Sequence, residues 1–238
     1  YLPDTIAVMD ITAKREMIAA GFPGRIITIT GQPAFDCLAG RHHYFNARRD
    51  YWVERYYNFR PDKKTAVFVS QPHSQQFYDY GYTEHTVIPL VIEAAITLGI
   101  DLIIRPHPRE DIAQLMQYEQ PGIQVRRLGL VHDLLMACSL VIGMNSELLI
   151  EACYLGCDVL SVQPGLIGRD CLPTNRIGVS QAAYDSLDVL PDMQQMLFTT
   201  DKKRRAALAK FAIKEPAGPK IARLIYRKLG VKHDKVSH

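Results

Sequence analysis

Short, unbroken runs of branched apolar residues recur along this chain and limit its fold more than any other feature. The clearest are the LII run at residues 102–104 and the LVI run at residues 140–142. Runs without polar alternation are typical of strands buried on both faces, as in a parallel sheet. Each run stops at a polar cluster, and ligands of open parallel sheets bind beyond the carboxyl ends of the strands. The sequence therefore predicts one pocket lined by both clusters, suited to a nucleotide or a phosphorylated ligand.

Strands and helices alternate from residue 65 onward. The predicted strands are 65–70, 102–105, 124–127, 140–143 and 159–163, and the predicted helices are 83–98, 111–118, 131–137, 146–155, 202–212 and 216–229. Such alternation favours βαβ units with right-handed crossovers and a parallel sheet. We therefore expect residues 61–238 to form one doubly wound, Rossmann-like α/β domain.

The first forty residues carry a smaller pattern of the same kind, with a strand at 5–9, a helix at 11–20 and a strand at 25–30. One β-α-β unit leaves two open sheet edges and little core, so it does not stand alone. We expect residues 1–40 to be the end of an N-terminal domain. Because the chain starts with Tyr1 just before a strand, we also expect it to be a fragment of a longer protein.

Residues 41–60 interleave basic and aromatic side chains. Phe45, Trp52, Tyr56 and Phe59 recur at helical spacing, which predicts an amphipathic linker helix. Basic residues among aromatics also occur where single-stranded nucleic acid is bound. The net charge of +3 is too small to favour nucleic acid as the main partner, so we prefer the linker helix.

Composition excludes several classes of protein. The chain has no apolar run of about 18 residues and no recognisable signal peptide at Tyr1, so a membrane span is not expected. Its five cysteines form no CxxC pair, which favours reduced thiols over a disulfide framework or a zinc site. We therefore expect a cytoplasmic protein without a metal. The basic run at residues 202–205 leaves contact with the inner face of a membrane as a lesser alternative.

The first polar cluster, Ser70 to Gln76, follows the first strand of the large domain. Gln71, His73 and Ser74 are its candidate ligand-binding residues, because doubly wound folds approach phosphates at this point. The loop matches neither a GxGxxG fingerprint nor a Walker-type phosphate loop. An ordinary loop closed by its own hydrogen bonds remains an equal alternative.

The second cluster is the RPHPR run at residues 105–109. Its two prolines stiffen the backbone around His107 and fix where the imidazole points. Arg105 and Arg109 can hold phosphate oxygens through two parallel hydrogen bonds. We therefore interpret His107 and both arginines as candidate ligands of a phosphate or a base. The alternative is a turn that caps the next helix.

The third cluster opens the helix predicted at 146–155. Asn145 or Ser146 can cap this helix, and the free N–H groups at a helix start suit a phosphate. Glu147 can accept from ribose or sugar hydroxyls, although solvated glutamates at 147 and 151 are an equal alternative. Gln163, at the end of the last predicted strand, completes the set of candidates.

With these residues in hand, the chain resembles the C-terminal, donor-binding half of GT-B glycosyltransferases. The nearest groups have a His-Pro motif: bacterial sialyl-, polysialyl- and Kdo transferases and polyglycerol-phosphate polymerases. Residues 105–108 resemble that motif, and residues 145–147 resemble the serine motif that holds donor phosphate in those families. Several of them have two hydroxyl residues there, whereas the first is Asn145 in this chain. Residues 30–36 are similar to the stretch that leaves the acceptor domain.

The resemblance implies a glycosyltransferase that transfers a sugar from a CMP- or UDP-activated donor to a glycan or lipid-linked acceptor, without a metal or other cofactor. It also implies that the general base lies upstream, in a missing N-terminal domain, so we leave that base unassigned, with His107 as the one candidate in this chain. A more distant similarity to UDP-sugar 2-epimerases leaves an epimerase or hydrolase as the alternative, beside a non-catalytic nucleotide- or nucleic-acid-binding module.

Overall fold

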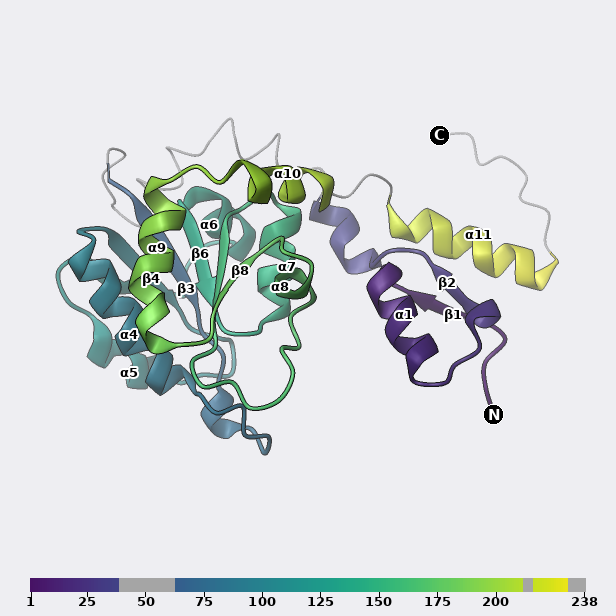
Figure 1. The fold of residues 1–238 in the computed structure, drawn as a ribbon, viewed down its shortest axis with the longest axis horizontal. Coiled ribbons are helices and arrows are strands. Elements are labelled where there is room, and N and C mark those ends of the chain that lie inside the picture. Colours follow the sequence, from purple (N-terminus) through teal and green to yellow (C-terminus); the bar gives the residue numbers. More distant parts are fainter. Residues whose placement is uncertain (39–62, 212–215, 231–238) are drawn as a thin grey trace. The chain divides into compact units, whose positions relative to one another are not determined.

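The computed structural model describes residues 1–38, 63–211 and 216–230, which belong to two compact units (Figure 1). The sheet unit contains residues 63–211. The terminal unit contains residues 1–38 together with residues 216–230. The linker helix predicted at 41–60 lies outside the described residues.

A six-stranded, fully parallel sheet forms the centre of the sheet unit (Figure 1). In spatial order, its strands are β5 (Ile123–Val125), β4 (Asp101–Arg105), β3 (Thr65–Val69), β6 (Leu140–Gly143), β7 (Val159–Val162) and β8 (Gln181–Ala183). This confirms the prediction of a doubly wound, Rossmann-like α/β fold. The chain order reverses between β3 and β6, and such a switch point is where open α/β sheets bind their ligands.

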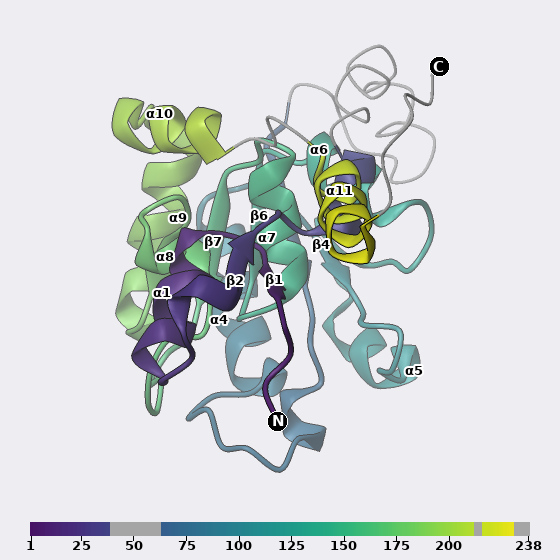
Figure 2. The same cartoon turned by 90° about the vertical axis from the view of Figure 1, so that its right-hand side faces the viewer.

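Helices cover both faces of this sheet. One face packs against α4 (Glu84–Thr97), α5 (Ile112–Leu115) and α9 (Val189–Phe198). The other face packs against α7 (Glu147–Tyr154), which contacts β6 and β7 and lies beside α6 (Val131–Ala137) and α8 (Pro173–Arg176) (Figure 2). Helix α10 (Lys202–Phe211) joins α7 through Tyr154 and Phe211, whose stacked rings are 4.4 Å apart.

The central strands are apolar because both of their faces are covered. All five residues of β3 are buried, and Phe68 has no exposed surface. At the end of β6, Gly143 allows α7 to lie close to the sheet. A Cβ at this position would be 2.8 Å from Val69 Cγ2 and 3.0 Å from Leu149 Cδ2.

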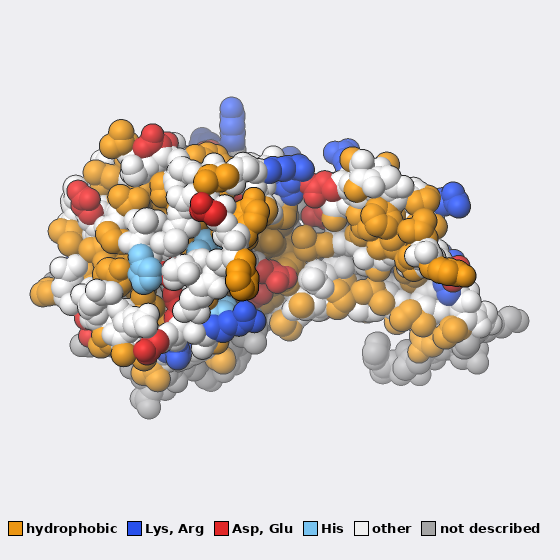
Figure 3. Space-filling model, turned by 90° about the horizontal axis from the view of Figure 1, so that it is seen from below, with side chains coloured by type: hydrophobic (Ala, Val, Ile, Leu, Met, Phe, Trp, Pro, Cys, Tyr) orange, Lys and Arg blue, Asp and Glu red, His pale blue; other side chains and the backbone are white. Residues whose placement is uncertain are grey.

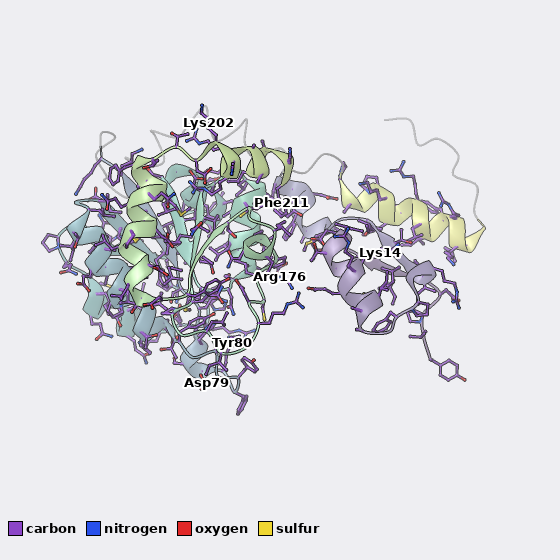
Figure 4. The ribbon with its side chains drawn as sticks, viewed as in Figure 1. Lys14, Asp79, Tyr80, Arg176, Lys202 and Phe211 are labelled. Carbon is purple, nitrogen blue, oxygen red and sulfur yellow. The ribbon has the colours of Figure 1, made fainter. Side chains whose placement is uncertain are left out.

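The terminal unit contains the predicted β-α-β pattern. Strand β1 (Ile6–Val8) pairs in parallel with β2 (Ile27–Ile29), and α1 (Ile11–Ala19) connects them. On α1, Lys14 Nζ donates to the carbonyl oxygen of Ile27 at 2.8 Å (Figure 4). A 3-10 helix, η2 (Pro33–Leu38), follows β2 and contacts α11 (Ala217–Leu229).

The structure corrects the expected domain boundary at the C-terminal end. We expected α11 to belong to the domain of residues 61–238, but it groups with the terminal unit. The physical reason is Asp36 of η2, whose carboxylate oxygens accept hydrogen bonds from the backbone N–H groups of Ala217 and Gly218, both at 2.7 Å. Within the described ranges, no helix has the length and apolar character needed to cross a membrane.

Candidate functional site

The three polar clusters begin at one edge of the sheet. In the register, Val69 of β3 lies opposite both Arg105 of β4 and Gly143 of β6. Neighbouring strands are about 4.8 Å apart, so the ends of β4 and β6 are separated by about 10 Å. Asp79 and Tyr80 mark this edge at the lower side of the sheet unit in Figure 4. Figure 3 shows the molecule from that side, and histidine and basic side chains appear on the surface.

The loop that carries His107 is held from both neighbouring strands. The buried carboxylate of Glu110 accepts from Ser70 Oγ at 2.7 Å and from the backbone N–H of His107 at 2.5 Å. From the loop after β5, Arg127 donates to the carbonyl oxygens of His107, at 3.1 Å, and Glu110, at 2.5 Å. The turn that the two prolines stiffen is therefore held by Ser70 and Arg127, which follow β3 and β5.

These contacts leave the half-buried His107 ring with one nitrogen for a ligand. Its Nδ1 accepts from the backbone N–H of Arg109 at 3.1 Å. A neutral imidazole whose Nδ1 accepts carries its proton on Nε2. Among the described residues, the Nε2–H group has no hydrogen-bond partner, so it is a donor that can meet an anion.

The turn before α7 is held by the loop after β3. Ser146 is the N-cap of α7, and its Oγ accepts from the backbone N–H of Leu148 at 3.2 Å. Gln71 Oε1 accepts from the backbone N–H of Asn145 at 3.1 Å, and His73 Nε2 lies 3.0 Å from Asn145 Oδ1. A helix start supplies free N–H groups and the positive end of the helix dipole.

The His73 ring that contacts Asn145 is buried. Only 4% of its surface is exposed, and its ring stacks on Tyr80 with centroids 4.6 Å apart. Burial lowers the pKa of His73, although the bond to Asn145 and the nearby Glu84 carboxylate oppose this shift. The ring is therefore neutral at pH 7 and fixed in orientation.

Three of the predicted ligand residues are engaged with the protein. Arg105 donates to the carbonyl oxygens of Leu128, at 2.5 Å, and Gly129, at 3.3 Å. Ser74 gives both its backbone N–H, at 3.0 Å, and its hydroxyl to Glu84. Arg105 and Ser74 therefore brace loops around the site, while Arg109 and Glu147 are exposed beside it.

Gln163, the third of these residues, has no exposed surface. Its amide group donates to Ser161 Oγ at 2.8 Å and to Asp170 Oδ1 at 3.1 Å, and its Oε1 accepts from Tyr82 at 3.0 Å. Because both ends of the amide are used inside the protein, we do not include Gln163 in the candidate site.

Asp170 is the centre of a buried network that the sequence did not indicate. Besides Gln163, its carboxylate accepts from the backbone of Leu172 at 2.7 Å, from Asn175 at 2.7 Å and from Tyr184 at 2.6 Å. Burial alone would raise the pKa of Asp170, but these four hydrogen bonds together lower it below its ordinary value. The network fixes the loop after β7 at the same edge of the sheet.

The two glutamates of α7 lie in different surroundings. Glu147 is exposed, as a solvated residue would be. Glu151 lies 2.5 Å from His132 Nε2, which joins α7 to α6. Within the described ranges, no group of three or more His, Cys, Asp or Glu side chains is arranged to hold a metal ion.

The sequence did not indicate roles for Glu110, Glu84 and Asp170, which position the loops of the site. Glu110 follows His107 by three residues, a spacing at which a carboxylate can reach back to a backbone N–H in a turn. This signal was available for Glu110. Asp170 accepts from Leu172 at the i+2 spacing of an Asx turn, which is also a local signal. Its bond to Tyr184 and the bond between Glu84 and Ser74 depend on tertiary packing, which local spacing does not reveal.

With this geometry established, comparison with known proteins adds the fold family. No protein-family model matches the chain, and no curated protein matches it either. The wall teichoic acid polymerase TagF, in a structure soaked with CDPG, matches with a TM-score of 0.60 and 13% identity over 95% of this chain and 57% of TagF.

Two similar structures are of other proteins with the same fold. The UDP-GlcNAc 2-epimerase from Neisseria meningitidis, bound to UDP-GlcNAc, has a TM-score of 0.63 and 11% identity over 93% of this chain and 60% of the epimerase. The S. aureus MnaA-UDP co-structure has a TM-score of 0.66 and 14% identity over 99% of this chain and 64% of MnaA. The chain thus spans about 60% of the length of these proteins, and it shares their GT-B, Rossmann-like fold.

Proposed function

We propose that the sheet unit binds the nucleotide-phosphate part of a nucleotide-activated sugar or related donor, as the donor-binding part of a glycosyltransferase. The observation that carries this proposal is the pairing of β3 with both β4 and β6, which puts the start of α7 at the switch point of the sheet and the His107 loop one strand away at the same edge. The similar structures of TagF with CDPG, of an epimerase with UDP-GlcNAc and of MnaA with UDP support this ligand class.

The chemistry of the site suits a phosphate. His107 offers Nε2–H, and the α7 start offers backbone N–H groups beside the Ser146 cap. Donors fixed in advance stabilise negative charge that grows on a departing phosphate without the cost of reorienting water. We propose this role for His107, Asn145 and Ser146, with an acceptor such as a glycan or a lipid-linked chain, and we assign no general base.

Calorimetric titration of the chain with CMP, CDP and UDP tests the proposal. We expect binding of at least one nucleotide diphosphate at submillimolar concentration. His107→Ala and Ser146→Ala should each weaken binding about tenfold, the loss expected for one hydrogen bond of about 1.4 kcal/mol.

Matched controls are available on the same unit. His85→Ala on α4 and Ser186→Ala, both at exposed positions, should leave the affinity unchanged. Absence of binding at nucleotide concentrations up to about 5 mM would contradict the proposal. So would equal losses in the control variants.

A sugar-nucleotide epimerase or hydrolase is the second candidate, because the UDP-GlcNAc 2-epimerase from Neisseria meningitidis matches with a TM-score of 0.63, above the 0.60 of TagF. Incubation with UDP-GlcNAc in the absence of acceptor separates the two functions. Epimerised or free sugar would favour the second candidate, whereas an unchanged UDP-GlcNAc that still binds would favour transfer.

A further inference from the structure

The side chain of Asn145 is oriented by a residue from another loop. Its Oδ1 lies 3.0 Å from Nε2 of His73, which follows β3, while Asn145 itself follows β6. His73 is 96% buried and stacked on Tyr80, so its ring does not turn away to release Asn145. The backbone of Asn145 is held as well, by Gln71.

This bond decides what Asn145 can offer to a ligand. An amide oxygen can only accept, so Nε2 of the neutral His73 carries the proton in this contact. The amide oxygen of Asn145 is therefore occupied, and its Nδ2 group points away from His73. Asn145 is half-buried, and its Nδ2 has no partner among the described residues. It is therefore a hydrogen-bond donor next to the Ser146 cap of α7.

We propose that His73 is a positioning residue that fixes Asn145 as a hydrogen-bond donor to an anionic oxygen of the ligand. The inference rests on the proposed function, since it assumes that the ligand carries a phosphate. It gives a reason for Asn145 at a position where a hydroxyl residue is expected: a serine can both donate and accept, whereas an asparagine held by His73 only donates. The site thereby selects an acceptor oxygen over a ligand hydroxyl that must donate.

A double-mutant cycle on the full chain tests this coupling. His73→Phe keeps an aromatic ring against Tyr80 but removes the donor, and Asn145→Ala removes the group it orients. With CDP and UDP as probes, we expect His73→Phe to weaken binding about tenfold in the wild-type background, and less than about twofold when Asn145 is already alanine. His73→Gln, which retains an amide donor, should restore part of the affinity. Equal losses from His73→Phe in both backgrounds would overturn the proposal.

A measurement without ligand separates this inference from the proposed function. In ¹⁵N-resolved NMR spectra of the ligand-free chain, His73→Phe and His73→Gln should shift the side-chain amide signal of Asn145. The amide signal of Asn175, which is held by Asp170, should not move and serves as the control. An unchanged Asn145 signal in both folded variants would overturn the positioning role even if nucleotides bind. A shifted signal in a protein that binds no nucleotide would instead contradict the proposed function and leave the His73–Asn145 contact established.

Discussion

The two units start from the same local pattern, a strand, a helix and a parallel strand, and they differ in what surrounds it. In the sheet unit, all five residues of β3 are buried and α4 contributes seven buried residues. In the terminal unit, β1 and β2 each contain one buried residue and α1 contains none. A β-α-β pattern therefore specifies local structure, while the covering layers supply the stability that a precise site requires.

The difference also explains where the candidate site lies. The sheet unit fixes its edge loops with buried carboxylates such as Glu110 and Asp170. Hydrogen bonds to charged groups contribute most where water is excluded. The terminal unit has a comparable anchor in Asp36, which is only half-buried.

The largest expected difference in stability comes from truncating an apolar side chain to alanine in each of the two sheets. Phe68→Ala in β3 should lower the free energy of unfolding of the sheet unit by about 4 kcal/mol, because the side chain is fully buried. Ile29→Ala in β2, whose side chain is 42% exposed, should cost about 1 kcal/mol or less. Urea denaturation followed by hydrogen exchange of each unit measures both, and similar costs at the two positions would refute the contrast.

The next largest difference is expected between the two carboxylates that anchor loops, Asp170 in the sheet unit and Asp36 in the terminal unit. Asp170→Ala leaves Gln163, Asn175 and Leu172 without their acceptor and should cost about 3 kcal/mol at pH 7. Asp36→Ala should cost about 1 kcal/mol, as for the loss of a helix cap. Thermal unfolding of both variants decides whether the ranking holds.

The stability that Asp170 contributes depends on pH, and the sign of this dependence follows from its lowered pKa. A carboxylate with a folded-state pKa below its unfolded value stabilises the protein above the unfolded pKa, and the contribution is lost as the pH falls through the folded pKa. The difference between wild type and Asp170→Ala should therefore narrow at acidic pH. A difference that stays constant down to pH of about 3 would show that Asp170 acts by packing alone.

A smaller difference in stability is expected when a glycine in each unit is replaced by alanine. Gly143→Ala would place a Cβ 2.8 Å from Val69 Cγ2, and we expect a cost of about 2 kcal/mol together with weaker nucleotide binding, since α7 must shift. Gly24→Ala in the terminal unit meets only the flexible end of Ile18, at 3.2 Å, and should cost less than about 0.5 kcal/mol. Equal effects of the two substitutions on stability would contradict this packing argument.

The smallest effect concerns His73. Burial lowers its pKa, so the neutral ring stabilises the folded state above the unfolded pKa and this stability is lost as the pH falls through the folded pKa. His73→Phe should remove this component, so that its stability depends less on pH between about 7 and 5 than that of the wild type. Parallel pH profiles for the two proteins would contradict the expectation.

The central strands and the edge at which the site lies were predictable because burial on both faces leaves a direct mark on the sequence. The runs at 102–104 and 140–142 became β4 and β6, and parallel pairing placed their polar ends together. Strand β8 was missed, because Gln181-Ala182-Ala183 contains no β-branched or aromatic residue and depends on β7 for its pairing. Helix α9 was missed as well; Pro191 lies in its first turn, where a proline is tolerated because the missing N–H has no partner within the helix.

The candidate site was predictable only in part. The positions of His107, Asn145 and Ser146 followed from strand ends and a helix start, which are local features. The side chains that hold Asn145 are distant in the chain, since His73 and Gln71 lie 72 and 74 positions before it. Such contacts arise from packing between loops, which separates the braces Arg105, Ser74 and Gln163 from residues that remain open to a ligand.

The central claim is that two loops of the sheet unit hold one anion and that the terminal unit does not. The most direct measurement is an NMR titration of the ¹⁵N-labelled chain with CDP, followed at the backbone amides of His107, Ser146 and Ile27. The His107 and Ser146 signals should shift together with a single dissociation constant, while the signal of Ile27 stays in place. Separate constants for the two loops, or shifts confined to the terminal unit, would contradict the claim.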